Sequence, residues 1–164
     1  LKNLLVIKFR RIFIGYKPFL IMLSGNQKEI LKALNKAKTK QTVIGSTIEN
    51  NRKILEHKNT KALILNHKLG KSMLYQQDSG LNQVLCKIAR NNNITLIIDL
   101  KDIKGDKQQK AIILAKIIQN LRLIKKYKPK LKIKGKNKYQ AASLLLVLGL
   151  PTDMIKQALS WPLT

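Results

Sequence analysis

Short apolar runs and helical stripes alternate along most of the chain, and this alternation constrains the fold more than any other feature. The clearest run, residues 94–99, is apolar at successive positions, which is typical of a strand buried on both faces. A helical pattern over about 106–126 follows it, with apolar residues at helical spacing. Repeated strand-helix units of this kind indicate a parallel α/β sheet or barrel.

The same criteria predict the remaining elements. Strands are expected at 4–9, 19–23, 42–44, 62–65, 94–99 and 131–134. Helices are expected at about 26–38, 48–57, 79–90, 106–126, 139–148 and 152–159, with Asn26 and Asp78 as N-caps of the first and third. The chain therefore carries about six strands.

The length of the chain limits how its strand-helix units can close into a barrel. A chain of 164 residues suits one domain over 1–164, and it is short for an eight-stranded barrel, which takes about 200 residues or more. Residues 10–17 are too few for a parallel crossover, which takes about a dozen residues. Either the first two strands pair antiparallel, or the first is displaced.

The charge points to a polyanionic partner. Lys and Arg total 33 against 8 Asp and Glu, a formal net charge of +25. Such an excess favours nucleic acid, because neutralising phosphates releases condensed counterions. An anionic membrane surface is the rival, but an interfacial helix needs bulky apolar anchors, and aromatics make up only 5% of the chain.

Several kinds of site and segment are not expected, because the chain lacks the residues that they require. One Cys and two His exclude a disulfide framework and a Cys/His zinc site. No apolar run approaches 18 residues, so no membrane-spanning helix is expected. Lys8, Arg10 and Arg11 interrupt the N-terminal apolar stretch, which lacks a small-residue cleavage site, so no signal peptide is expected. We expect a cytoplasmic protein.

Lysine recurs at every second position near the C-terminal end. The series is Lys128, Lys130, Lys132, Lys134, Lys136 and Lys138. Because strand side chains alternate between faces, the three lysines of the 130–134 segment should share one face, with Leu131 and Ile133 on the other. A closed barrel interior cannot hold them, since each unpaired charge would cost several kcal/mol. We expect this strand to border an open part of the sheet and its lysines to contact RNA phosphates. The alternative is a solvated edge strand that lysine protects from aggregation.

Groups suited to catalysis are sparse. Asp99 and Asp102 lie near one strand end, but a hard metal ion needs more convergent oxygen ligands. His57 and His67 are isolated, with His57 expected to cap a helix or lie on the surface. Cys86 lies on an apolar helical stripe, which predicts a buried structural thiol. We therefore predict neither a metal site nor a catalytic residue.

Four stretches in a fixed order carry a resemblance to a known family. Residues 78–87 read DSGLNQVLCK, similar to a signature of Asp-x-Gly, an aliphatic, Asp or Asn, and x-Val-Leu-Ala-Lys. Residues 93–101 resemble a strand that starts with Asn-Val and ends in Leu-Arg. Residues 119–128 match a helix ending in Lys-Tyr, and 147–150 with 158–160 fit the closing helices. From about residue 18 to 162, the chain resembles protein component 3 of ribonuclease P, the archaeal counterpart of the eukaryotic thirty-kilodalton subunit.

The resemblance implies a fold and a role. The family fold is TIM-barrel-like, which implies a reduced or incomplete (β/α) barrel of about six strands, with the family's N-terminal strand-helix unit missing or shortened. The chain begins at Leu1, which fits an alternative start codon or a missing beginning. The implied role is a non-catalytic, RNA-binding subunit of ribonuclease P. The RNA of that holoenzyme uses magnesium and removes the 5′ leader of precursor tRNA.

The resemblance also implies partners and contacts. The partners are ribonuclease P RNA, protein component 2 and other protein subunits, and precursor tRNA within the holoenzyme, with an apolar patch for the protein partner. Lys87, Arg90, Lys101 and Arg122 become candidate RNA or partner contacts beside the lysine series.

Three residues of the signature, Asp78, Gly80 and Asn82, are expected to be structural. After the last strand the chain departs from the family, with Gly135 to Tyr139 in place of a small-residue turn and a basic segment with an Asp. Two alternatives stay open: a general basic RNA-binding or ribosome-associated protein, and a divergent metal-dependent phosphoesterase.

Overall fold

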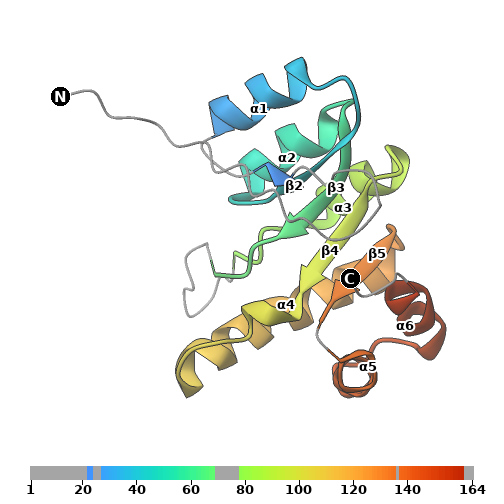
Figure 1. Ribbon diagram of the computed structural model, residues 1–164. Helices are drawn as coiled ribbons and strands as arrows, with labels where there is room; N and C mark the ends of the chain where they lie inside the picture. The colour runs from blue at the N-terminus through green and yellow to red at the C-terminus, as the bar shows by residue number, and fades with distance from the viewer. Residues whose placement is uncertain (1–21, 24–26, 69–77, 136, 161–164) are drawn as a thin grey trace.

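Five parallel strands form one sheet in which the strand order follows the chain (Figure 1). The computed structural model describes residues 22–23, 27–68, 78–135 and 137–160. The strands are β1 (Met22–Leu23), β2 (Gln41–Ile44), β3 (Thr60–Leu65), β4 (Thr95–Asp99) and β5 (Leu131–Lys134). The helices are α1 (Gln27–Lys36), α2 (Ile48–Glu56), α3 (Gln83–Asn91), η1 (Leu100–Asp102), α4 (Lys107–Tyr127), α5 (Lys138–Val147) and α6 (Thr152–Leu159).

The expected alternation of strands and helices is confirmed over these residues. The predicted strand at 131–134 and the predicted helix at 152–159 have the observed bounds. Of the strand expected at 19–23, only β1 is described. The strand expected at 4–9 and the N-cap at Asn26 lie outside the described residues. Six strands are therefore not confirmed, and the described residues form a sheet of five.

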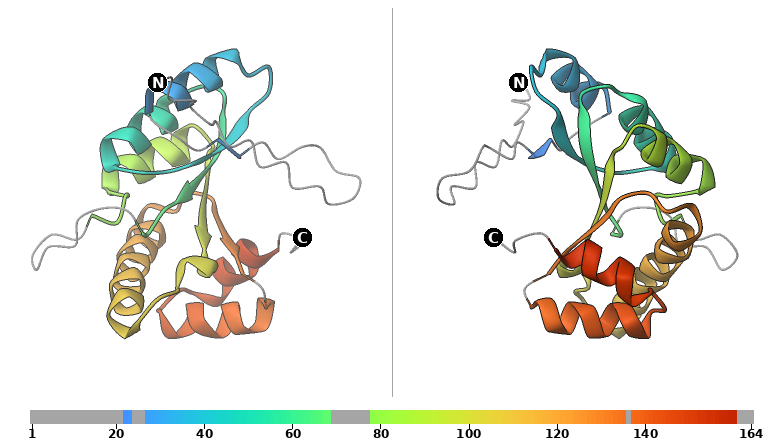
Figure 2. Two further views of the ribbon diagram at one scale, coloured as in Figure 1. Left: turned by 60° about the vertical axis from the view of Figure 1, so that its left-hand side comes forward. Right: turned by 90° about the vertical axis from the view of Figure 1, so that its right-hand side faces the viewer.

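One face of the sheet is packed against helices. Consecutive parallel strands joined by right-handed crossovers leave their connecting helices on the same face. Helix α2 packs on β3, α3 on β4 and α6 on β5, while α3 lies between α2 and α4 (Figure 2). The strand residues that point into this core are almost wholly buried: Val43, Leu63, Leu65, Leu96, Ile98, Leu131 and Ile133.

The opposite face, called the second face below, carries the alternate strand residues. In register across β2 to β5 these are Thr42, Ile44, Ala62, Ile64, Thr95, Ile97, Asp99, Lys132 and Lys134. Burial on this face decreases toward β5. Ala62 and Ile64 of β3 are 3% and 8% exposed, whereas Ile97 of β4 and Lys132 of β5 are half-buried. The second face therefore becomes accessible to solvent at its β5 side.

Two helical segments lie at the carboxyl ends of β4 and β5. The single turn η1 follows β4 directly, and Asp99 caps it by accepting a hydrogen bond from Lys101 N at 2.9 Å. Helix α5 begins four residues after β5, with Asn137 accepting from Tyr139 N and Gln140 N. Among the described residues, no helix combines the length and the apolar character needed to cross a membrane.

Candidate nucleic-acid interface

The lysines of β5 point away from the helix-packed core, as their alternation predicts. Leu131 and Ile133 are 9% and 4% exposed and face the core, whereas Lys132 and Lys134 are half-buried on the second face. Because β5 pairs only with β4 within the described ranges, its other edge has no neighbouring strand there. Water can reach this edge, so charged side chains can lie on a strand of a sheet that is otherwise largely apolar.

Two other lysines act electrostatically on Lys132. The pKa of Lys132 is lowered, first by burial and then by the positive charges of Lys61 and Lys130. Lys61 belongs to β3, at a register shift where Gln41 pairs with Thr60 and Thr42 with Ala62. We call Lys61, Lys130 and Lys132 the lysine cluster. Because like charges repel one another, an anion bound near Lys132 would relieve this effect.

Charges of both signs meet at the carboxyl ends of the strands. Lys134 Nζ lies 3.8 Å from Asp99 Oδ2, and Lys68 Nζ lies 3.3 Å from Asp102 Oδ1. Burial raises the pKa of Asp102, against the opposing effect of Lys68. No group of three or more His, Cys, Asp or Glu side chains that could hold a metal ion occurs in the described part of the chain.

The other predicted contacts lie in the helix layer. Lys87 and Arg90 are exposed on α3, and Arg122 is exposed on α4. Lys87 Nζ lies 5.9 Å from the centroid of the Tyr127 ring, close enough for a cation–π contact. These helices cover the core face of the sheet, so the structure does not bring these three residues together with Lys132 and Lys134.

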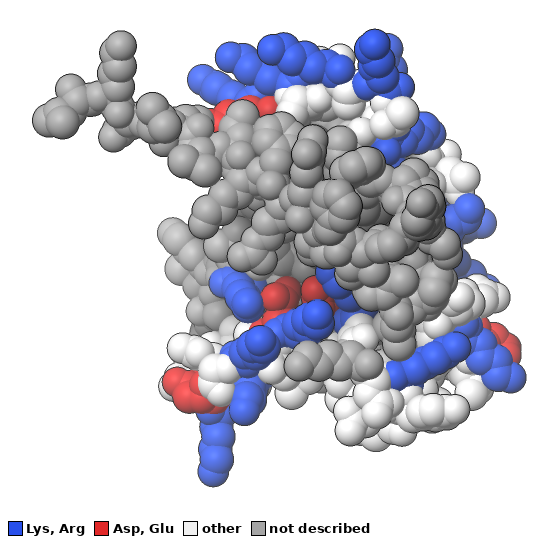
Figure 3. All heavy atoms as spheres, in the orientation of Figure 1, with Lys and Arg blue, Asp and Glu red and all other residues white. Residues whose placement is uncertain are grey.

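The remaining lysines of the series flank β5. Lys128 is the C-cap of α4, in the left-handed conformation with φ 52°, and Lys138 is exposed in the first turn of α5. Lys101 is exposed in η1, and Lys136 lies outside the described residues. Among the residues coloured by charge in Figure 3, Lys and Arg side chains occur at many places and acidic side chains at few.

The signature residues are structural, but one assignment is wrong. Asp78 does not cap α3, because the helix begins only at Gln83 and Asn82 is its N-cap, accepting from Leu85 N at 2.9 Å. Gly80, with φ +73°, keeps residues 78–82 out of the helix. Asp78 instead accepts from Gly80 N at 2.9 Å and closes a turn.

A buried polar cluster joins two loops to α4. His67, Lys116 and Asn120 are at most 2% exposed. Asn120 Nδ2 lies 3.1 Å from His67 Nε2 and donates to the Ser79 carbonyl at 3.0 Å. Burial, with a contribution from the charge of Lys116, lowers the pKa of His67 to about 4. The ring is therefore neutral at pH 7.

The two other candidate reactive side chains are structural. Burial raises the pKa of the Cys86 thiol to about 12, and the side chain is fully buried, as predicted. His57 is the C-cap residue of α2, where its Nδ1 accepts from Asn59 N at 3.2 Å. The capping role expected for His57 is confirmed.

Sequence reasoning missed several basic residues. Lys61 has no second lysine in its strand, so no local pattern relates it to Lys132 of β5. Lys68 follows β3 and Lys104 follows η1, both in loops. The rule that strands adjacent in the chain lie adjacent in the sheet could have indicated that Lys61 and Lys68 of the β3 segment lie near β4.

The strand order and the basic surface define a class of protein: an α/β protein of consecutive parallel strand-helix units with cationic side chains at an open strand. No family model matches the chain. Ribonuclease P protein component 3 of Methanococcus vannielii is 33% identical over 110 residues, which are 65% of this chain and 45% of that protein. The chain is thus a relative of ribonuclease P protein component 3, and the resemblance noted in the sequence is confirmed. It spans less than half the length of that curated relative.

The fold has a counterpart among solved structures. A chain in the cryo-EM structure of archaeal ribonuclease P with mature tRNA matches with a TM-score of 0.63 and 22% identity. The match covers 85% of this chain and 62% of that chain. It supports the parallel α/β fold described above.

Proposed function

We propose that this chain is an RNA-binding subunit of ribonuclease P that supports the catalytic RNA in removing the 5′ leader of precursor tRNA. The observation that carries the proposal is the 33% identity with component 3 over 110 residues. The net charge of +25 and the lysine cluster are consistent with this role, because both suit a phosphate backbone.

The proposed architecture is a partial (β/α) barrel. Five parallel strands in chain order have the arrangement of neighbouring barrel strands. In a closed barrel the second face would be filled by side chains from every strand, yet here it carries Lys132 and Lys134. In this proposal, lysines contact RNA at the edge of β5 that has no neighbouring strand among the described residues.

The chain acts, in this proposal, without catalysing the reaction itself. The magnesium ions of the holoenzyme are used by the RNA subunit, and the protein works in the cytoplasm with component 2. An apolar patch on α5 suits the protein partner, since Tyr139, Leu146 and Val147 are 85%, 51% and 84% exposed. Tyr139 and Leu146 lie on the same side of α5 about two turns apart, and Val147 follows Leu146 about 100° further around the helix.

Reconstitution tests the role. The protein, the matching ribonuclease P RNA and component 2 are mixed with precursor tRNA at modest magnesium, and 5′ leader removal is measured with and without this chain. The proposal expects cleavage that depends on the chain. A variant with K61Q, K130Q and K132Q should require a higher protein concentration for the same rate.

A matched variant controls for charge alone. Lys28, Lys32 and Lys36 are exposed on α1, and K28Q, K32Q and K36Q together remove the same charge far from the cluster along the sheet. Equal losses in the two variants, with equal affinity for unrelated RNAs, would favour a general basic RNA-binding protein instead.

A further inference from the structure

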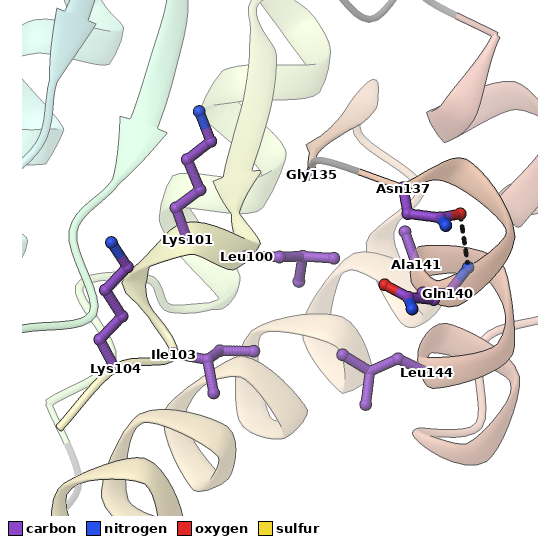
Figure 4. Close-up of a pocket in the computed structure, with 9 residues that line it drawn as sticks. All are labelled: Leu100, Lys101, Ile103, Lys104, Gly135, Asn137, Gln140, Ala141 and Leu144. Atoms are coloured by element: carbon purple, nitrogen blue, oxygen red, sulfur yellow. Dashed lines mark hydrogen bonds between the residues drawn. The ribbon is translucent and has the colours of Figure 1, made fainter. Parts of the chain in front are cut away.

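A pocket opens at the carboxyl ends of β4 and β5, between η1 and the first turns of α5 (Figure 4). Its volume is about 370 Å³. That lies near the lower limit for ligand pockets, and proteins of parallel strand-helix units place their binding sites at this end of the sheet.

The pocket has an apolar interior and a polar rim. Leu100 and Ile103 project toward Ala141 and Leu144 of α5, as Figure 4 shows. Gly135 completes the wall, and its missing side chain leaves room there. No aromatic or acidic side chain of the described residues lines the pocket. The interior therefore suits an uncharged and largely apolar group.

Two side-chain amides stand at the pocket with hydrogen-bonding capacity to spare. Asn137 Oδ1 accepts from the backbone of α5, which leaves its Nδ2 without a partner in the described part of the chain. The Gln140 side chain is exposed and makes no hydrogen bond with the described residues. A ligand that offers both donors and acceptors on its edge would satisfy these amides.

Two lysines make the rim positive. Lys101 and Lys104 extend side by side from η1 and the residues after it, in the same direction and away from the apolar interior (Figure 4). Neither ammonium forms an ion pair with a described carboxylate; the nearby Asp99 pairs with Lys134 and Asp102 with Lys68. Anionic groups of a ligand would lie here, outside the pocket.

We propose that this pocket holds the base of an unpaired RNA nucleotide, with the flanking phosphates on Lys101 and Lys104. A nucleobase combines a flat apolar face with donors and acceptors at its edge, and its phosphates carry the negative charge that the rim attracts. The proposal rests on the RNA-binding role given above and adds that part of the contact is to single-stranded RNA. The pocket is thus a different site from the lysine cluster, whose positive charges would bind phosphates of any RNA.

Short RNAs test the pocket without the holoenzyme. The probes are a fluorescent single-stranded hexaadenylate or hexauridylate, a hexamer of abasic ribonucleotides with the same phosphates, and a duplex of similar length. Fluorescence anisotropy gives each dissociation constant. We expect at least one base-containing single strand to bind roughly tenfold tighter than the abasic strand, a factor that corresponds to about 1.4 kcal/mol.

Two variants address the pocket with little change of charge or fold. A Cβ on Gly135 would lie 3.4 Å from Leu100 Cδ1 and 3.7 Å from Ala141 Cβ, ordinary contact distances, so G135A narrows the pocket without a clash. Q140A removes the rim amide from an exposed position, and Q157A removes an exposed amide on α6 as its control. We expect G135A and Q140A to weaken base-containing strands about fivefold, with abasic binding and Q157A unchanged.

Three outcomes would overturn the proposal. Equal affinity for abasic and base-containing strands excludes a base in the pocket. Unchanged single-strand binding in both G135A and Q140A places the base contact elsewhere. Displacement of the strand by micromolar nucleoside monophosphate makes a free nucleotide the ligand. Failure of leader removal in reconstitution, by contrast, concerns the holoenzyme role and leaves these binding results standing.

Discussion

Asn51 Nδ2 donates a 2.7 Å hydrogen bond to the carbonyl oxygen of Gly80, across 29 residues of sequence. The same side chain accepts from Ser46 N at 2.8 Å, and Asn51 is 1% exposed. One buried amide of α2 therefore holds both the loop after β2 and the turn that precedes α3. These loops lie at the carboxyl side of the sheet, the side at which the pocket beside η1 also opens.

Replacing Asn51 by Ala should reduce stability strongly. N51A leaves the Gly80 carbonyl and the Ser46 N–H without this partner, and we expect the free energy of unfolding to fall by about 2–3 kcal/mol. Urea denaturation measures it. N50A is the matched control, since Asn50 Nδ2 donates to Ser46 Oγ at a half-buried site and its loss should cost below about 1 kcal/mol. Similar losses in the two variants would contradict the bridging role of Asn51.

Gly80 should tolerate no side chain. Its φ of +73° is unfavourable for other residues, and a Cβ would lie 3.2 Å from Asn51 Nδ2. We expect G80A to lower the free energy of unfolding by about 1–2 kcal/mol, the cost of the left-handed conformation. G135A adds the same methyl group where no positive φ occurs and should leave the unfolding midpoint nearly unchanged. The opposite ranking of the two variants would refute this interpretation of the turn.

His67 should make stability depend on pH. Its folded pKa is about 4, below the ordinary value of 6.5, so the unfolded chain binds a proton first as the pH falls. The contribution of His67 is complete above pH 6.5 and is lost between pH 6.5 and about 4, by about 3 kcal/mol in total.

Comparison with a variant isolates this titration from the carboxylates that titrate nearby. Urea unfolding at pH 7, 5.5 and 4.5 gives the slope of stability against pH for the wild type and for H67Q. We expect the stability of H67Q to change less with pH over that interval. The difference in slope corresponds to at most one bound proton, about 1.4 kcal/mol per pH unit. Equal slopes would mean that His67 titrates normally in the folded protein.

Local patterns were enough to predict most of the fold. The alternation in Leu131, Lys132, Ile133 and Lys134 predicted the strand, its bounds and the face of each side chain, because one face of β5 is buried and the other is wet. A short periodic pattern of this kind depends only on neighbouring residues.

The errors arose where distant residues decide the local structure. Asp78 has the chemistry of an N-cap, but the positive φ of Gly80 and its bond to Asn51 hold the chain in a turn up to Asn82. Lys61 affects Lys132 because β3, β4 and β5 are neighbours in the sheet, an arrangement that no local pattern encodes. The pocket at η1 depends on how α5 returns across the strand ends, which the spacing of apolar residues does not specify.

The lysine cluster should contribute to the salt dependence of RNA binding. Each lysine–phosphate pair contributes about 0.7 to the slope of log Kobs against log salt for a single strand, so K61Q/K130Q/K132Q should reduce the slope by about 2 if all three lysines bind phosphates. Anisotropy titrations at several salt concentrations measure it. The α1 variant K28Q/K32Q/K36Q keeps the cluster and should retain most of the wild-type slope. Because both variants lower the net charge equally, a drop of the same size in each would show that overall charge, and not the lysine cluster, governs the binding.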